Sequence, residues 1–274
     1  IPDELKVLTP RILNHRRVDG RLEIVQEYYG YPTLAELYLY GELHPDTWIS
    51  ILRQILRIFE EFQRYPGTLE FADIQAMYVE KTFDRLAELK IQSPYWEEFL
   101  SQETVIYNDR PLLNFYHLEA AIRQKAKTIA ESPQICVIHG DFCFSNILFD
   151  ISNQIIRLID PRGRFGQKGI YGDPRYDLAK LRHSVSGLYD FIVADLFELH
   201  QDQHGFNGQV FTHSLPSTLG PSLDSMISEA GFNIAEIRII EGLLFISMLP
   251  LHFGNLKRQK ILYLTGLSLL NEVL

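Results

Sequence analysis

The chain has 274 residues, of which 46% are hydrophobic and 22% are charged, the balance of an ordinary globular protein. Its formal net charge of −9 argues against non-specific binding to nucleic acid. Its two cysteines are too few for a disulfide scaffold and fit no zinc motif, so we expect a reducing, cytoplasmic setting. The longest apolar run, at 242–251, contains Pro250 and falls far short of the ~20 residues that membrane insertion requires.

The start of the chain is expected to be rich in β-structure. Residues 6–29 read as extended segments on either side of Asp19-Gly20, and Asp-Gly between apolar runs is a strong hairpin signal. After Gly30, Thr33 and Glu36 have the spacing of a helical capping box.

Helical periodicity dominates the rest of the chain. Apolar residues recur at helical spacing over 45–65, and further helices are expected at 77–89 and 112–130. Two short strands interrupt them around the polar segment 137–160. We expect helices again from residue 178 to the end, with a loop at 205–221.

The segment 137–160 carries the clearest chemical signal. It places His139, Asp141 and Asn146 on one loop and Asp160 at the end of the following apolar run. Phosphoryl transfer from ATP requires one carboxylate to accept the proton of the attacking hydroxyl, and it requires an amide and a second carboxylate to hold magnesium. Asn146 lies five positions after Asp141, which is the spacing found in the catalytic loop of protein kinases. No second histidine lies at ligand spacing, which argues against a metallohydrolase.

Four segments, in this order, resemble the aminoglycoside phosphotransferase and choline kinase family. Residues 24–30 (IVQEYYG) are similar to the hinge strand, and 139–146 (HGDFCFSN) to the catalytic loop. Residues 158–160 (LID) are similar to the metal-binding strand end, and 172–181 (GDPRYDLAKL) to the GDP-x-x-D-L-A signature. The resemblance implies an α+β, protein-kinase-like fold.

The same resemblance divides the chain into two parts. Residues 1–30 would be a short β-rich remnant of the N-lobe with its hinge strand, and residues 31–274 a mostly helical C-lobe with the catalytic loop and metal site. The family's glycine-rich loop and strand lysine have no counterpart before Ile24, so we expect 1–30 to be a partial N-lobe.

Roles follow from the resemblance position by position. Asp141 would be the general base, with His139 bracing its loop, and Asp177 would tie that loop to the helix behind it. Asn146 and Asp160 would bind Mg²⁺. Adenine of ATP would lie against the residues Glu27, Tyr28, Tyr29 and Leu148.

The predicted function is an ATP- and Mg²⁺-dependent phosphotransferase acting on a hydroxyl of a small metabolite. A sugar or polyol is favoured as the acceptor, for example in polysaccharide or cell-envelope metabolism. Arg162 and Arg164 either face an anionic group or form a solvated basic loop.

The alternatives to this function are a non-catalytic pseudokinase and a choline- or aminoglycoside-type kinase with a cationic acceptor. For a cationic acceptor, Trp96 and neighbouring tyrosines could form an aromatic cage, although core packing is favoured for them. The sequence leaves the oligomeric state open.

Overall fold

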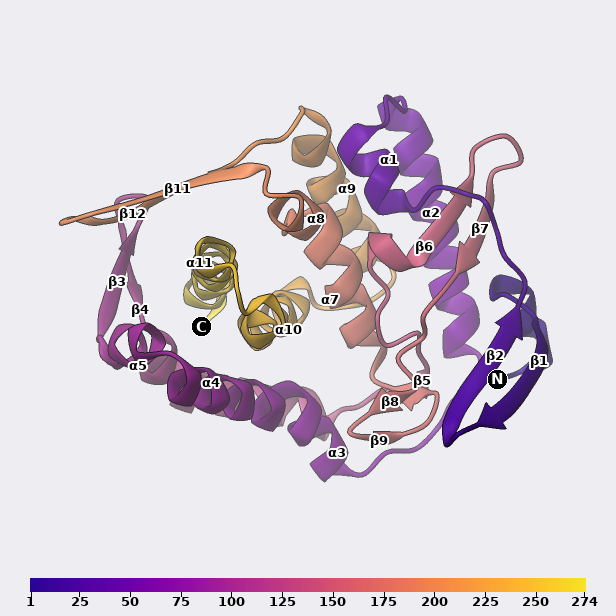
Figure 1. Ribbon diagram of the computed structural model, residues 1–274, viewed down its shortest axis with the longest axis horizontal. Coiled ribbons are helices and arrows are strands. Elements are labelled where there is room, and N and C mark those ends of the chain that lie inside the picture. Colours follow the sequence, from indigo (N-terminus) through magenta and orange to yellow (C-terminus); the bar gives the residue numbers. More distant parts are fainter.

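The computed structural model describes residues 1–274, and it joins an N-terminal hairpin to a larger, mostly helical body (Figure 1). The long helices are α2 (Pro45–Gln63), α4 (Lys81–Gln92), α6 (Glu119–Glu131), α7 (Pro174–Val185), α9 (Leu215–Glu229), α10 (Ile234–Ser247) and α11 (Leu256–Val273). The shorter helical elements are η1 (Asp3–Leu8), α1 (Leu34–Tyr40), α3 (Phe71–Gln75), η2 (Ala76–Glu80), α5 (Pro94–Ser101), η3 (Phe115–Leu118), η4 (Phe144–Asn146), α8 (Tyr189–Val193) and η5 (Leu249–His252). None of the helices is long and apolar enough to cross a bilayer.

The strands form five small sheets rather than one large one. Their pairs are β1 (Ile12–Val18) with β2 (Arg21–Gln26), β5 (Cys136–Val137) with β10 (Tyr171–Gly172), β6 (Ile147–Asp150) with β7 (Ile155–Leu158), and β8 (Arg164–Phe165) with β9 (Gln167–Lys168). The fifth sheet has the order β11 (Phe197–Asp202), β12 (Gly205–Val210), β3 (Thr104–Tyr107), β4 (Arg110–Leu113). The α+β class, with a short β-rich start and a helical body, is confirmed.

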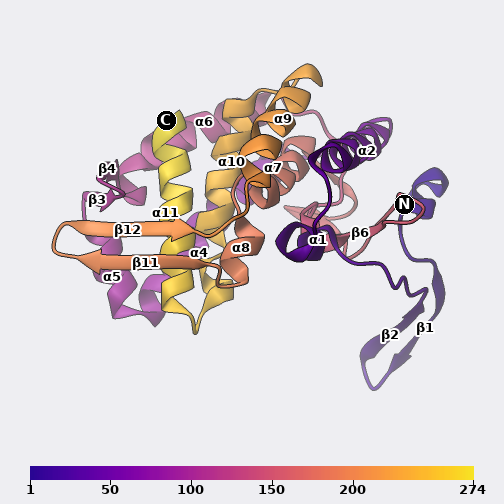
Figure 2. The same cartoon turned by 90° about the horizontal axis from the view of Figure 1, so that it is seen from above.

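The predicted hairpin is present as β1 and β2. Asp19 and Gly20 both have positive φ, 51° and 77°, as a two-residue turn matched to strand twist requires. The hairpin projects from the body (Figure 2), and every one of its residues is exposed. The expectation of extended chain from residue 6 is wrong, because residues 3–8 form the 3₁₀ helix η1.

The first helices match their predictions. At α1, Thr33 Oγ1 accepts from the Glu36 amide while the Glu36 carboxylate accepts from the Thr33 amide, a complete capping box. Helix α2 ends at Gln63, two residues before the predicted limit. Its apolar face, which includes Trp48 and Phe59, is buried in the core.

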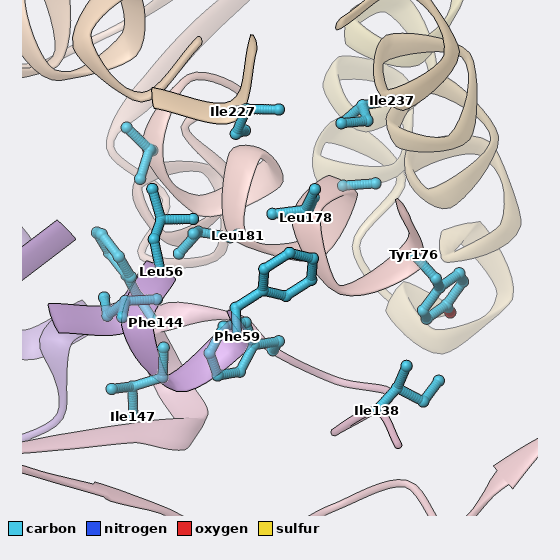
Figure 3. Close-up of a cluster of buried hydrophobic side chains, with 14 of the residues drawn as sticks. Leu56, Phe59, Ile138, Phe144, Ile147, Tyr176, Leu178, Leu181, Ile227 and Ile237 are labelled. Carbon is cyan, nitrogen blue, oxygen red and sulfur yellow. The ribbon is translucent and has the colours of Figure 1, made fainter. Parts of the chain in front are cut away.

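Helix α7 lies at the centre of the body. Phe59 of α2, Leu181 of α7 and Ile227 of α9 belong to one apolar cluster that also contains Phe144 of the catalytic loop (Figure 3). Every residue of α7 is buried. Its polar side chains therefore need partners inside the protein.

Two expected helices differ in extent from the structure. The helix predicted at 77–89 begins as the π-helical turn η2 and continues as α4 to Gln92. The helix predicted from residue 112 begins later, because Leu112 and Leu113 belong to strand β4. Asn108 and Asp109, both with positive φ, form the turn that joins β3 to β4.

The prediction of helices from residue 178 to the end, interrupted only by a loop at 205–221, is wrong in part. Helix α7 begins at Pro174, and residues 197–210 form the antiparallel hairpin β11–β12. The loop predicted at 205–221 contains β12 and then the start of α9, which continues through Pro221.

Trp96 is fully buried and its Nε1 donates to Gln259 Oε1, which confirms core packing for this side chain.

Candidate active site

The loop that carries His139, Asp141 and Asn146 connects β5 to β6. Phe142 and Phe144 are fully buried in the core and anchor the loop, and Gly140 turns the chain with a φ of 78°. A Cβ atom at Gly140 would lie only 2.8 Å from Cβ of Arg162, so the glycine lets the loop and the segment after β7 approach closely. The polar residues of the loop are thereby held beside Asp160.

Helix α7 supports this loop through one stripe of side chains. Asp177 Oδ2 accepts from the His139 amide at 2.7 Å, and its Oδ1 accepts from the Gly140 amide at 2.8 Å. Ser184 Oγ accepts from the Phe144 amide at 3.0 Å. Burial raises the pKa of the Asp177 carboxyl to about 7, while the two amide donors act to lower it.

Lys180 lies between these two residues on the same stripe. Its Nζ is 2.8 Å from Oδ1 of Asp141, and the lysine is buried. Burial acts to raise the pKa of Asp141, but Lys180, with smaller contributions from His139 and Arg162, outweighs it, so the pKa of Asp141 is lowered. Conversely, burial acts to lower the pKa of Lys180, but Asp141, with Tyr176 and Cys143, outweighs it, so the pKa of Lys180 is raised. The pair is therefore ionised at neutral pH.

The His139 ring is fully engaged within the loop. The Asp141 amide donates to His139 Nδ1 at 3.3 Å, so Nε2 carries the proton and donates to the Ile159 carbonyl at 3.0 Å. Burial lowers the pKa of His139, which favours this neutral tautomer. With neither ring nitrogen free, the histidine is suited to bracing the loop rather than to proton transfer.

Asn146 and Asp160 lie at the same end of the β6–β7 pair. The Ile159 amide donates to the Asn146 carbonyl at 3.0 Å, which fixes the two segments together. Asn146 Nδ2 donates to the Asp141 carbonyl at 2.9 Å and to Asp141 Oδ2 at 3.0 Å, and no protein group donates to the Asn146 side-chain oxygen. Asp160 is exposed, makes no ion pair and has a φ of 56°.

These two oxygen donors fit a magnesium ion shared with a ligand. Mg²⁺ commonly takes one or two protein oxygens and completes its shell with phosphate and water. No group of three or more His, Cys, Asp or Glu side chains gathers elsewhere to form a metal cage.

A cavity of about 500 Å³ opens between the N-terminal hairpin and this metal-type site. Its lining includes Glu27, Tyr28, Tyr29, Leu148 and Asp160. The Glu27 amide is bonded to Arg11, whereas the Glu27 carbonyl and the Tyr29 amide have no partner in the chain. The cavity thus joins a free backbone donor and acceptor, an apolar side chain and a carboxylate.

The family model of the phosphotransferase enzyme family, APH, matches residues 3–202. The chain belongs to this family. The match includes the hinge segment, the catalytic loop, Asp160 and helix α7, which are the segments that carried the resemblance in sequence.

Among solved structures, the APH chain is similar to the crystal structure of an aminoglycoside-3'-phosphotransferase of type VIII. The TM-score is 0.47 at 15% identity, over 89% of this chain and 75% of the other. A search of curated proteins gave no match.

Within this APH protein, the structure brings most of the sequence-predicted residues together. Asp141, His139, Asn146 and Asp177 form one connected group, and Asp160 adjoins it because Ile159 bonds to both His139 and Asn146. Arg162 joins it through its amide, which donates to the His139 carbonyl at 2.9 Å. Arg164 is exposed, and its Nε donates to the Gly166 carbonyl.

Sequence reasoning missed Lys180, Ser184 and two further cations, Lys81 and Arg85. A signal for the first two was present, because Asp177, Lys180 and Ser184 have the i, i+3, i+7 spacing of one helical face. Lys81 and Arg85 lie on α4, far from the catalytic loop in sequence, and no motif marks them.

Proposed function

We propose that this APH protein transfers a phosphoryl group from Mg²⁺-ATP to a hydroxyl group of a small metabolite. The observation that carries the proposal is the placement of Asn146, which contacts Asp141, at the same end of the β6–β7 pair as Asp160, which lines the cavity. Asn146 Nδ2 donates a hydrogen bond to Asp141 Oδ2. Asp160 lines the cavity together with residues of the hinge segment.

Asp141 is the proposed general base. Its carboxylate is held by Lys180 at the buried Oδ1 and by Asn146 at Oδ2, and Oδ2 retains a second lone-pair direction for an acceptor hydroxyl. Its lowered pKa makes it a weak base, which suits a loose phosphoryl-transfer transition state in which the proton leaves late. Alignment of the hydroxyl is therefore its main contribution.

Asn146 and Asp160 are the proposed metal ligands. Magnesium bound there would neutralise charge on the transferred phosphoryl group and on the leaving phosphates. Asn146 links the two parts of the site, since its amide nitrogen contacts Asp141 while its side-chain oxygen is available to the metal.

The cavity at the hinge is the proposed nucleotide site. The Glu27 carbonyl and the Tyr29 amide supply the acceptor and donor that the edge of adenine requires. Leu148, on β6, supplies an apolar floor for the ring. Tyr28 is 91% exposed and borders the opening of this cavity.

A sugar or polyol is the proposed acceptor. The metal-binding Asp160 is followed by Pro161 and Arg162, and no aromatic side chain directly adjoins it in the chain. Arg162 is bonded to the catalytic loop and acts on Asp141, so its positive charge disfavours a cationic acceptor there.

Transfer of label from γ-³²P-ATP tests this proposal, with sugars, polyols, their phosphorylated forms and amino alcohols as acceptors. Asp141→Asn should lower turnover at least ~100-fold, because it removes the general base, and should leave Mg²⁺-ATP affinity nearly unchanged. Asp109→Asn changes an exposed turn carboxylate and serves as the matched control. Equal transfer by wild type and Asp141→Asn would contradict the assignment.

A further inference from the structure

A second cavity, of about 340 Å³, lies at the other end of the segment 160–164. Four cationic side chains line it: Lys81 and Arg85 from α4, and Arg162 and Arg164 from the segment after β7. The chain as a whole is acidic, with 35 acidic and 26 basic residues. The lining of this cavity, in contrast, carries more positive than negative side chains.

None of these four cations is paired with a carboxylate. Lys81 Nζ and Arg162 Nη1 each donate to the Tyr176 hydroxyl at 3.3 Å, and Arg85 Nη1 donates to the Ser247 carbonyl at 2.6 Å. Two acids also line the cavity. Of these, Glu80 is paired with Arg123 at 2.9 Å, and Asp84 makes no ion pair.

The cations disfavour one another in the absence of an anion. Burial lowers the pKa of Lys81 well below its ordinary value, and the charges of Arg162, Lys180 and Arg85 lower it further. Lys81 and Arg85 are partly buried while Arg162 and Arg164 are exposed, and an anion in the cavity would offset the mutual repulsion of these charges.

A chain of contacts connects the lining of this cavity to the general base. Tyr176, which accepts from both Lys81 and Arg162, lies one helical turn before Lys180 on α7, and Lys180 contacts Asp141. Arg162 is bonded through its backbone to His139 in the catalytic loop. Arg162 also acts to lower the pKa of Asp141, so the positive charge of the cavity reaches the general base.

We propose that the acceptor carries a phosphate group in addition to the hydroxyl that is phosphorylated, as a phosphorylated sugar or polyol does. The inference rests on the proposed function, and it adds the charge class of the acceptor. Guanidinium groups favour phosphate because their paired N–H donors match its oxygens, and three of the four cations are arginines. The neutral and cationic members of the acceptor panel should accordingly be poor substrates.

Calorimetric titration at low ionic strength tests this proposal with three probes: inorganic phosphate, glucose 6-phosphate and, as the neutral match, glucose. The two phosphate probes should bind to the wild-type chain and glucose should not. Lys81→Gln and Arg85→Gln should each weaken phosphate binding by about tenfold or more, the loss expected for one charge-assisted hydrogen bond. Lys90→Gln, on the same helix but outside the cavity, is the matched control.

Mg²⁺-ADP is titrated in parallel to separate the two proposals. Affinity for Mg²⁺-ADP should be unchanged in both variants. If it falls as far as phosphate affinity, the cations serve the nucleotide phosphates and the acceptor proposal is overturned. Phosphate binding no tighter than that of glucose would overturn it as well, while Mg²⁺-ADP binding by the same sample would leave the proposed function intact.

Melting temperatures establish that the variants are folded. Lys81→Gln removes a partly buried amine that has no ionic partner and that neighbouring cations disfavour, so it should not lower the melting temperature. If Arg85→Gln unfolds because the Ser247 carbonyl loses its donor, Lys81→Gln and the exposed Arg164→Gln provide the same comparison.

Discussion

Lys180 Nζ lies 2.8 Å from Oδ1 of Asp141, inside the protein. Through this contact, helix α7 fixes the position and the charge state of the proposed general base. Every residue of α7 is buried. Because Asp177, Lys180 and Ser184 lie on one face of this helix, they contact residues 139–140, 141 and 144 in the same order. The loop and the helix therefore form one rigid support for Asp141.

Lys180→Met should raise the pKa of Asp141. Burial continues to favour the neutral carboxyl in the variant, whereas the ammonium that opposes burial is gone. An NMR titration of the Asp141 carboxyl carbon should place its midpoint above that of the wild type, and the acidic limb of the rate profile should move toward neutral pH. The exposed Lys127→Met is the control. An unchanged midpoint would mean that the ion pair does not set the ionisation of Asp141.

Gly140→Ala should destabilise the protein more than Gly163→Ala. Both glycines have positive φ, 78° and 62°, so each substitution incurs the ~1–2 kcal/mol that a side chain costs in this region. Only at Gly140 would the new Cβ meet a neighbour, Cβ of Arg162 at 2.8 Å, while Gly163 has open space. Chemical denaturation measures both losses. Equal values would show that the close approach of the two segments is unimportant for stability.

Asp177→Asn should reduce stability by about 1–3 kcal/mol, because a buried amide loses its acceptor. The asparagine oxygen can accept from one of the His139 and Gly140 amides, and its NH₂ group faces the other. Hydrogen exchange at these two amides should accelerate. Ser184→Ala, which removes a single acceptor from the Phe144 amide, provides the comparison within the same stripe. Unchanged exchange at residues 139 and 140 would contradict the bracing role of Asp177.

His183→Phe should make the protein less sensitive to acid. His183 is fully buried with no hydrogen-bond partner on either ring nitrogen, and it packs between Tyr189 and Phe245 at centroid distances of 4.2 and 4.1 Å. Burial lowers its pKa well below the ordinary 6.5, so the unfolded state binds the proton more readily. Stability contributed by the neutral ring is present above pH 6.5 and is lost as the pH falls below that value, by at most about 1.4 kcal/mol per pH unit.

Unfolding free energies from pH 7 to pH 5 measure this effect. The difference between wild type and His183→Phe isolates one histidine, because the other buried groups, including His139 and Asp177, are the same in both proteins. The exposed His117→Phe is the control. Parallel curves for wild type and His183→Phe would exclude His183 as a source of acid sensitivity.

Local signals predicted the parts of the fold that depend on neighbouring residues. The Asp19-Gly20 turn and the Thr33 capping box formed as predicted, because their stabilising contacts lie within a few residues. The hairpin β11–β12 was missed, since β12 also pairs with β3, about a hundred residues earlier in the chain. Such pairing depends on tertiary packing, which overrides helical periodicity.

In the candidate site, too, features set by neighbouring residues were predicted, and features set by tertiary packing were not. The catalytic loop and Asp160 are recognisable in sequence because their spacing is imposed by one loop and one strand pair. The cations of the second cavity come from α4 and from the segment 160–164, which only the folded body brings together. The acidic net charge of the chain gave no indication of this basic cavity.

Binding of ATP tests the central claim most directly, by calorimetry with and without magnesium, on the wild-type chain and on Asp160→Asn. Asparagine keeps the size of the side chain and tolerates the positive φ at this position, so a lost response reports on the carboxylate. We predict magnesium-dependent binding by the wild type and weaker, magnesium-insensitive binding by Asp160→Asn. Absence of binding by the wild type, or an equal magnesium response in both proteins, would contradict a nucleotide and metal site at Asp160.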